Sequence, residues 1–551
     1  MVIRHHSLNF HVGAKLMKKL AVDGRFYKGR GLAFAHWLRK PLLLLMAGML
    51  AMVTHASDYA LVINHGRVID PESGLDATRH IGVRDGTIVA VSTAPLVGDI
   101  TIDATGLVVA PGFIDLHTHS PTQLGQYYQA FDGVTTALEL EAGHYPLQSY
   151  GAQISSEAMI NFGASAGYIG MRLFEKNGLV MSGGIGQPKP EGYKGWKTAL
   201  VNLIWGNDAA LAPTLRETAN LQELSQLRNL LETDLAQGAL GVGLALDYIS
   251  EAVGDAEIAM IFQVAAQAGV PVFVHVRRGI DGDPAGLREV ISLAAQYDTS
   301  VHVCHISHNA ISNLDLFLVE VAAAQEQGVD ITTEVLPYNA GSALISSAVF
   351  SRDWQTIFNI DYADVEWAAT GERFDKAMWD DYRADHPQGQ VIHHYLEEAW
   401  TQRAVIEPGV IVVSDLLPME SKDKNVAPHN GAFSKVLGRY VREEQLLDLS
   451  TALGKMTILP ARRLEHFAEA FRRKGRIQLA MDADITIFDP LTIMDNATYQ
   501  QPYREADGIA YVIVNGHAII AEGKRVENSF PGKRILATSS DSTNQGKIHD
   551  R

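Results

Sequence analysis

The chain has 551 residues, of which 47% are hydrophobic and 20% are charged, a composition typical of a globular protein large enough for a barrel with additional subdomains. Its formal net charge of −17 argues against a nucleic-acid partner, because phosphate binding needs basic clusters. The single cysteine, Cys304, excludes an intrachain disulfide and leaves the compartment to other signals.

Residues 1–56 are predicted to be an N-terminal extension that ends in a signal peptide. Arg39 and Lys40 precede the apolar run 41–53, and the small residue Ala56 follows shortly after it. A basic flank, a short apolar run and a small residue are typical of a secretory signal, and the run is shorter than the roughly 20 residues of a membrane span. We therefore expect export to the periplasm or the exterior with no stable membrane span after cleavage. An uncleaved N-terminal anchor is the alternative.

Short strands separated by turns occur near both ends of the chain. Residues 57–110 contain the runs 59–63 and 87–91, and residues 471–536 contain the runs 484–488 and 511–515. Hairpins at this spacing indicate β structure. We expect the two segments to form one small β-sandwich domain.

Between these segments, apolar runs alternate with helical stretches over residues 111–344 and 406–470. The runs include 107–114, 135–140, 272–276, 300–304, 331–335 and 411–413. Such alternation predicts a parallel α/β fold, which we interpret as a distorted (β/α)8 TIM barrel. Residues 345–405 interrupt this alternation and are expected to form an inserted helical subdomain or lid. Residues 537–551 are polar and aperiodic, and are expected to be disordered.

The strongest chemical signal is a pair of histidines at the end of the first apolar run. His117 and His119 follow Pro111-Gly-Phe-Ile-Asp115. Residues two apart on a strand face the same side, so both imidazoles can reach one metal ion. Imidazole is a good ligand for zinc and similar ions.

Further metal donors end the later apolar runs. They are Glu139 and Glu141, then His275, His305 and Asp415. The active sites of TIM barrels lie at the carboxyl ends of the strands. The convergence of Glu, His, His and Asp after His-x-His therefore predicts a metal centre.

These residues lie within a series of motifs that resembles the amidohydrolase superfamily, and within it the N-acyl-D-amino-acid deacylases. The motifs are Pro111-Gly-Phe-Ile-Asp-Leu-His-Thr-His119, Gly133-Val-Thr-Thr136, Gly238-Ala-Leu-Gly-Val-Gly243, His275-Val-Arg277, Leu336-Pro-Tyr-Asn-Ala-Gly341, Ser414-Asp415, Phe433-Ser-Lys-Val-Leu-Gly-Arg-Tyr-Val-Arg442, Lys455-Met-Thr-Ile-Leu-Pro-Ala461 and Asp482-Ala-Asp-Ile-Thr-Ile-Phe-Asp489. The resemblance implies a barrel hydrolase that holds one or two divalent ions, with Zn²⁺ expected.

The resemblance also implies individual roles. His117 and His119 would bind the first ion, His275 and His305 the second, and Asp415 would contact metal and act as general base and acid. The D-aminoacylases have a cysteine ligand where this chain has Ala142. We expect the nearby Glu141 to bridge the ions instead. Glu139, which shares its strand face, is the alternative.

Substrate recognition is less well marked. The resembling deacylases hold the amino-acid carboxylate with a lysine and an arginine. This chain has Ile306-Ser-His308 at the first place and Pro428-His-Asn-Gly431 at the second, so neither cation is present. Arg277, Arg278 and His429 are therefore candidates for a replacement, and Tyr338 is a candidate to stabilise an oxyanion.

The expected function is deacylation of an N-acyl (D-)amino acid or a related linear amide. The alternatives are cyclic-amide opening of the dihydroorotase or hydantoinase kind, a dipeptidase reaction, and an inactive ligand-binding barrel. The acyl group, the stereochemistry, the metal identity and the oligomeric state stay open.

Overall fold

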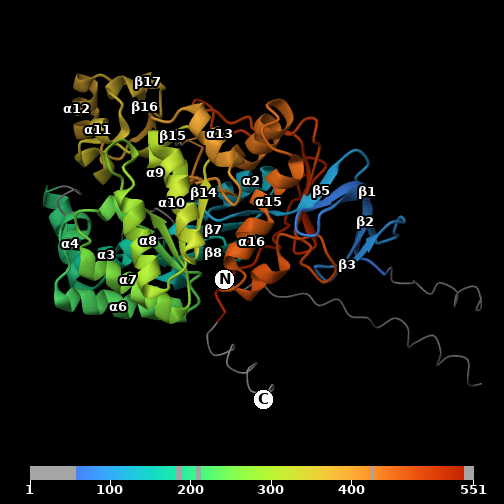
Figure 1. Cartoon of the computed structure of the whole chain (residues 1–551), viewed down its shortest axis with the longest axis horizontal. Coiled ribbons are helices and arrows are strands. Elements are labelled where there is room, and N and C mark those ends of the chain that lie inside the picture. The colour runs from blue at the N-terminus through green and yellow to red at the C-terminus, as the bar shows by residue number, and fades with distance from the viewer. Residues whose placement is uncertain (1–57, 181–188, 206–212, 423–426, 428, 539–551) are drawn as a thin grey trace, which may run out of the picture. The chain divides into compact units, whose positions relative to one another are not determined.

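A computed structural model describes residues 58–180, 189–205, 213–422, 427 and 429–538 (Figure 1). The predicted signal peptide and almost all of the predicted disordered tail lie outside these residues. No helix within the described ranges is long and apolar enough to span a membrane.

Eight parallel strands form the barrel, and each pairs with the next in chain order. They are β6 (Phe113–Asp115), β7 (Val134–His144), β8 (Asn161–Gly167), β11 (Val242–Ala245), β12 (Val272–His275), β13 (Val301–Val303), β14 (Ile331–Val335) and β19 (Ile411–Val412). The sheet closes just beyond the strand ends, through a parallel bridge between Thr118 and Leu416. The expectation of a distorted TIM barrel is thereby confirmed.

Helices cover the outer face of the barrel strands. They include α2 (Gln123–Phe131), α3 (Tyr168–Asn177), α4 (Gly192–Trp205), α6 (Leu221–Ala236), α7 (Asp255–Ala268), α8 (Ala285–Tyr297), α9 (Ile306–Ala310), α10 (Leu314–Glu326), α13 (Glu398–Ile406), α14 (Ala432–Lys435), α15 (Leu449–Met456) and α16 (Ile458–Leu464). Figure 1 shows α6, α7 and α8 next to one another in green. Because helices and barrel interior bury both faces, strands such as β11 and β12 consist of buried residues throughout.

The two ends of the chain build one nine-stranded sheet. Its members are β1 (Leu61–Asp70), β2 (Leu75–Arg84), β3 (Thr87–Ser92), β4 (Ile100–Asp103), β5 (Val108–Pro111), β20 (Ile485–Phe488), β21 (Ile509–Val514), β22 (His517–Ala521) and β23 (Lys524–Arg525). Antiparallel pairing of β20 with β5 joins the two ends, as expected. The sheet has its own apolar core, which includes Ile63, Val109, Ile485 and Ile513.

A buried ion pair links this β domain to the barrel. Lys474 Nζ lies 2.6 Å from Asp484 Oδ2, beside β20. The same carboxylate accepts hydrogen bonds from Asn161 on barrel strand β8 and from the backbone of Asn515. With these partners the buried charges are compensated, and the position of the β domain against β8 is fixed.

The insertion contains helices, as expected. It also contains a four-stranded antiparallel sheet that the sequence patterns do not predict. Its strands are β15 (Ala340–Leu344), β18 (Gln390–His394), β16 (Val365–Trp367) and β17 (Glu372–Arg373), and its longer helices are α11 (Trp354–Phe358) and α12 (Lys376–Asp385). The sheet begins at Ala340, within the segment first assigned to the barrel. Its strands are short and pack on an aromatic cluster around Phe350, Trp354 and Trp379. Their sequences therefore show no clear alternation of apolar and polar residues.

Candidate metal centre and its pocket

The end of β6 presents the two histidines of the His-x-His motif to the same point. The Nε2 atoms of His117 and His119 are 3.2 Å apart. Asp115 stabilises the turn, because its carboxylate accepts hydrogen bonds from the backbone N–H groups of His117 and Ser414. This contact also ties the end of β6 to the segment that follows β19.

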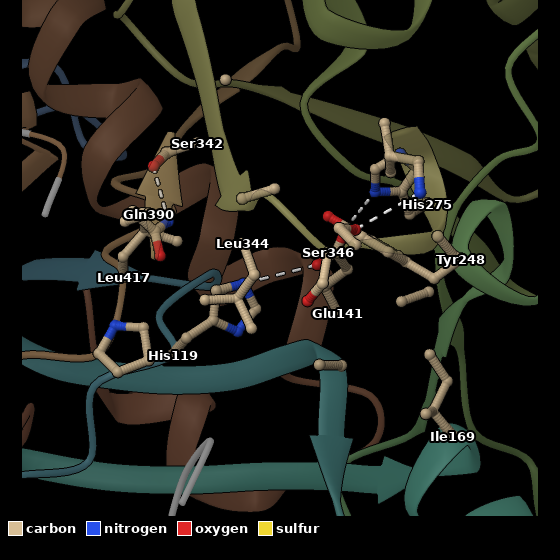
Figure 2. A pocket seen from close by; sticks show the side chains of 18 of the residues that line it. His119, Glu141, Ile169, Tyr248, His275, Ser342, Leu344, Ser346, Gln390 and Leu417 are labelled. Atoms are coloured by element: carbon tan, nitrogen blue, oxygen red, sulfur yellow. Dashed lines mark hydrogen bonds and ion pairs between the residues drawn. The ribbon is translucent and has the colours of Figure 1, made fainter. Parts of the chain in front are cut away.

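Glu141 lies between two pairs of histidines. Its Oε2 is 3.2 Å from His117 Nε2 and 3.5 Å from His119 Nε2. Its Oε1 is 2.8 Å from His275 Nδ1 and 2.9 Å from His305 Nε2. Figure 2 shows the Glu141 carboxylate directed at His275. One carboxylate therefore faces two sets of imidazoles, one with each oxygen.

Asp415 adds a further carboxylate at the wall of the pocket. Its Oδ1 lies 3.4 Å from His117 Nε2 and 3.3 Å from His119 Nε2. Asp415 and His305 both have positive φ, 46° and 29°. This conformation is unfavourable for side chains other than glycine and is found preferentially at functional sites.

Two carboxylates outside the centre determine how His117 and His119 present their nitrogens. His117 Nδ1–H donates to Glu334 Oε1 at 2.6 Å, and His119 Nδ1–H donates to Glu139 Oε2 at 2.9 Å. When these imidazoles are neutral, each Nε2 carries an unshared lone pair, and the two lone pairs face each other. Two lone pairs at this separation repel unless a cation lies between them, so the geometry fits a metal site.

The spacing of the donor atoms supports the same conclusion. Ligands at 2.0–2.1 Å from a tetrahedral Zn²⁺ are about 3.4 Å from one another. The Nε2 atoms of His117 and His119 lie 3.2 to 3.5 Å from each other and from the nearest oxygens of Glu141 and Asp415. A second group, Glu141 with His275 and His305, also brings its donor atoms together. The residues can hold one divalent ion, or two that share Glu141.

The electrostatics of the centre also favour a cation. Burial by itself lowers the pKa of His117, but the charges of Asp415, Glu141 and Glu334 raise it well above its usual value. Burial raises the pKa of Glu141, and the surrounding histidines bring it well below its usual value. The carboxylates are thus ionised in a buried pocket, and a divalent ion can compensate their charge as protonated imidazoles would.

Glu334 and His302 are not marked by the sequence patterns. His302 Nε2–H donates to Glu334 Oε2 at 2.9 Å, so Glu334 connects His302 to His117. The available signal was a carboxylate inside the apolar run of β14, where a charge needs a buried partner. Glu139 lies behind His119, while Glu141 lies among the histidines.

A cavity of about 1020 Å³ opens over the donors. His119, Glu141, His275, His305 and Asp415 line its floor, and the insertion contributes part of its wall. Figure 2 shows Tyr248 and Ile169 at the edge of the same pocket. Tyr248, which the sequence patterns do not indicate, packs edge-to-face on His275 with ring centroids 5.4 Å apart.

The candidate substrate residues fall into two groups. His429 lines the cavity; its Nδ1–H donates to the backbone oxygen of Asp415 at 2.8 Å, and its buried Nε2 has no partner among the described residues. Arg278 also lines the cavity.

The expected substrate contacts of Arg277 and Tyr338 are not what the structure shows. The Arg277 guanidinium binds Glu289 and the backbone oxygens of Ser250 and Val253, and Arg277 does not line the cavity. Tyr338 stacks behind His429 with ring centroids 5.1 Å apart, away from the cavity wall.

A family model described as the amidohydrolase family matches residues 101–520, which is more than half of the chain. The chain belongs to the amidohydrolase family. It is 28% identical to an N-acyl-D-glutamate deacylase of Alcaligenes xylosoxydans xylosoxydans, over 84% of this chain and 94% of the relative. It is also 28% identical to a D-aminoacylase of the same organism, over 88% of this chain and 98% of the relative.

Among solved structures, the fold is similar to that of N-acyl-D-glutamate deacylase from Bordetella bronchiseptica, described in complex with zinc and a phosphonate inhibitor. The TM-score is 0.66 at 24% identity, over 87% of this amidohydrolase and 100% of that chain. At this identity the likeness supports the fold alone.

The geometry predicts that the two glutamates of β7 contribute unequally to metal binding. We expect Glu141→Ala to lose most of the bound divalent ion, because Glu141 contacts both histidine pairs. Glu139→Ala removes only the hydrogen-bond partner of His119, and should weaken metal affinity by roughly 10- to 100-fold. Elemental analysis after dialysis against a range of chelator concentrations measures both. Equal metal loss, or greater loss in Glu139→Ala, would contradict the arrangement.

Proposed function

We propose that this amidohydrolase is a metal-dependent deacylase that hydrolyses the amide bond of an N-acyl D-amino acid. The observation that carries the proposal is Glu141, with one oxygen on each of two histidine pairs and Asp415 beside it at the cavity floor. The similarity to an N-acyl-D-glutamate deacylase and a D-aminoacylase supports the substrate class.

In this proposal His117, His119, Glu141 and Asp415 would hold one divalent ion, and Glu141, His275 and His305 a second. The nitrogen and oxygen donors suit Zn²⁺. Such an ion acts as a Lewis acid that lowers the pKa of water to about 7.

Asp415 would move the proton. Its side chain is 18% exposed and lines the cavity, so it can contact both water and substrate. The nearby histidines lower its pKa against the effect of burial, which keeps the carboxylate ionised and able to accept a proton from the attacking water. It can then donate that proton to the leaving nitrogen.

Tyr248 would support the substrate carbonyl in place of Tyr338. It lines the cavity beside His275, whereas Tyr338 lies behind His429. A hydroxyl donor at this position can hydrogen-bond to an oxygen that gains negative charge during hydrolysis.

A substrate panel tests the proposed function. The zinc-loaded protein would be assayed on N-acetyl-D-amino acids, N-acetyl-L-amino acids, dihydroorotate, hydantoins and dipeptides, with release of free amine as the readout. We expect hydrolysis of the N-acetyl-D-amino acids and its loss in chelator. Turnover of the cyclic amides or dipeptides alone would favour the corresponding alternative. Binding without turnover of any member would favour a ligand-binding barrel.

We predict that Asp415→Asn lowers turnover by about 10² or more, the usual scale for a proton-transfer group. The amide is nearly the same size but cannot accept the proton. Turnover and metal content should be measured on the same preparation, at saturating zinc. Turnover equal to that of the unmodified protein in fully metal-loaded Asp415→Asn would refute the assignment.

We also propose that the protein is exported. The support is the basic flank and the apolar run at 41–53, followed by Ala56. Mass spectrometry of protein recovered from fractionated cells should find a mature N-terminus near Ser57, outside the cytoplasm. An intact N-terminus in the cytoplasmic fraction would contradict export, and an intact N-terminus in the membrane fraction would favour the anchor.

A further inference from the structure

Arg278 is a buried cation whose guanidinium makes no hydrogen bond to the residues that the structure describes. It follows β12 and lines the cavity, and its side chain is 7% exposed. Its Nη1 is 3.7 Å from Asp247 Oδ2, beyond hydrogen-bonding distance. Its Nε is buried and has no partner among the described residues. The guanidinium lies over the ring of Phe358, 5.2 Å from the centroid.

The nearest carboxylate is already engaged by other donors. Asp247 accepts a hydrogen bond from Arg352 Nη2 at 2.8 Å and another from the backbone N–H of Arg278 at 2.9 Å. Two guanidinium groups thus share one negative charge, and this part of the wall keeps an excess of positive charge. Burying a cation without hydrogen bonds is unfavourable unless an anion can reach it.

Further polar side chains line the cavity near this cation. Tyr395 Oη, His308 Nε2 and His393 Nδ1 are all buried and have no hydrogen-bond partner within the part of the chain that the structure describes, and all three residues line the cavity. Burial lowers the pKa of His393 to about 3. The His393 imidazole is therefore uncharged, and Arg278 supplies the positive charge.

These groups are contiguous. The rings of Phe358 and Tyr395 are 4.7 Å apart, those of His393 and Tyr395 are 5.0 Å apart, and those of His308 and Tyr395 are 5.7 Å apart. His308 in turn lies 5.9 Å from the ring of His305 in the metal centre. This contiguous group, here called the Arg278 subsite (Arg278, Phe358, Tyr395, His393 and His308), therefore begins next to the metal donors.

We propose that Arg278 binds a carboxylate of the substrate, with Tyr395 and His308 as further hydrogen-bonding partners. This inference rests on the proposed deacylase function, and it assigns the anion contact to Arg278, because neither cation of the resembling deacylases is present in this chain. Phe358, His393 and Tyr395 come from the insertion, so the insertion completes the subsite. An amino-acid substrate can offer the α-carboxylate or a side-chain carboxylate, and both have the same chemistry.

The test compares substrates that differ in one charge. N-acetyl-D-methionine and N-acetyl-D-methioninamide differ at the α-carboxylate, whereas N-acetyl-D-glutamate and N-acetyl-D-glutamine differ at the side chain. Each would be assayed with the zinc-loaded protein, Arg278→Gln and Arg278→Lys. Arg352→Gln is the matched control, because it removes the other guanidinium on Asp247 at a residue that does not line the cavity. Melting temperature and zinc content are measured for every variant.

We expect Arg278→Gln to raise KM for the preferred carboxylate substrate by at least about tenfold, the scale of one charged hydrogen bond. The KM for the neutral substrate of the same pair should change little. Arg278→Lys should restore part of the preference for the carboxylate substrate. If the KM difference disappears in the methionine pair, Arg278 binds the α-carboxylate. If it disappears in the glutamate–glutamine pair, Arg278 binds the side-chain carboxylate. Equal losses on both members of each pair, or the same pattern in Arg352→Gln, would overturn the proposal.

A binding measurement separates this inference from the proposed function. Zinc-loaded Asp415→Asn would be titrated calorimetrically with N-acetyl-D-methionine and N-acetyl-D-glutamate, before and after the additional change Arg278→Gln. Weaker binding by at least about tenfold supports the subsite even if the substrate panel shows no deacylation. Unchanged binding of both carboxylates refutes the subsite even if the panel confirms deacylation.

Discussion

The structure depends on one constraint: the Glu141 carboxylate must lie within 3.5 Å of four imidazole nitrogens in a buried pocket. The four histidines are supplied by the ends of β6, β12 and β13, and Glu141 by β7. In a closed parallel barrel the carboxyl ends of all strands meet at one rim. The closure between Thr118 and Leu416 also brings Asp415 from the last strand to His119 from the first.

The carboxylates that orient the histidines are as necessary for the metal centre as the metal donors themselves. Glu334 and Glu139 accept the Nδ1 protons of His117 and His119 and so direct their Nε2 lone pairs inward. His275 is oriented the other way, with Nδ1 toward Glu141 and Nε2 3.8 Å from Asp247. A buried group of four carboxylates and several imidazoles is stable only if its charge is balanced. A divalent ion on Glu141 balances the inner carboxylates without changing the hydrogen bonds of the outer ones.

The parts of the site that could be predicted from the sequence are those set by local spacing. His-x-His at the end of an apolar run places both imidazoles on one face, and the same reasoning finds His275, His305 and Asp415. The expected preference for Glu141 over Glu139 rests only on its position nearer Ala142, because the two share a strand face. Their actual placement depends on the irregular pairing of β7, whose register with β8 shifts after Glu139.

Other features depend on contacts between residues far apart in the chain. Glu334 is 217 positions from the His117 that it orients, so no local pattern reveals the pair. Arg277 and Arg278 are adjacent, and strand alternation cannot distinguish them because the chain leaves β12 at His275. The sheet of the insertion was missed because its strands are short and its aromatic core forms only after β15 and β18, nearly fifty residues apart, have paired.

The strand ends supply the metal donors, whereas the insertion supplies much of the Arg278 subsite. The groups for hydrolysis and the groups for substrate selection therefore come from different parts of the chain. The metal donors come from the strand ends, where rigid elements fix their distances. Phe358, His393 and Tyr395 come from a subdomain with its own core, which can change without displacing any of those donors. Arg278 lies three residues after His275, the last residue of β12, so the barrel positions its guanidinium and the insertion encloses it. A change in the insertion therefore alters the size and polarity of the Arg278 subsite, whereas the distance from its charge to the metal centre stays set by the barrel.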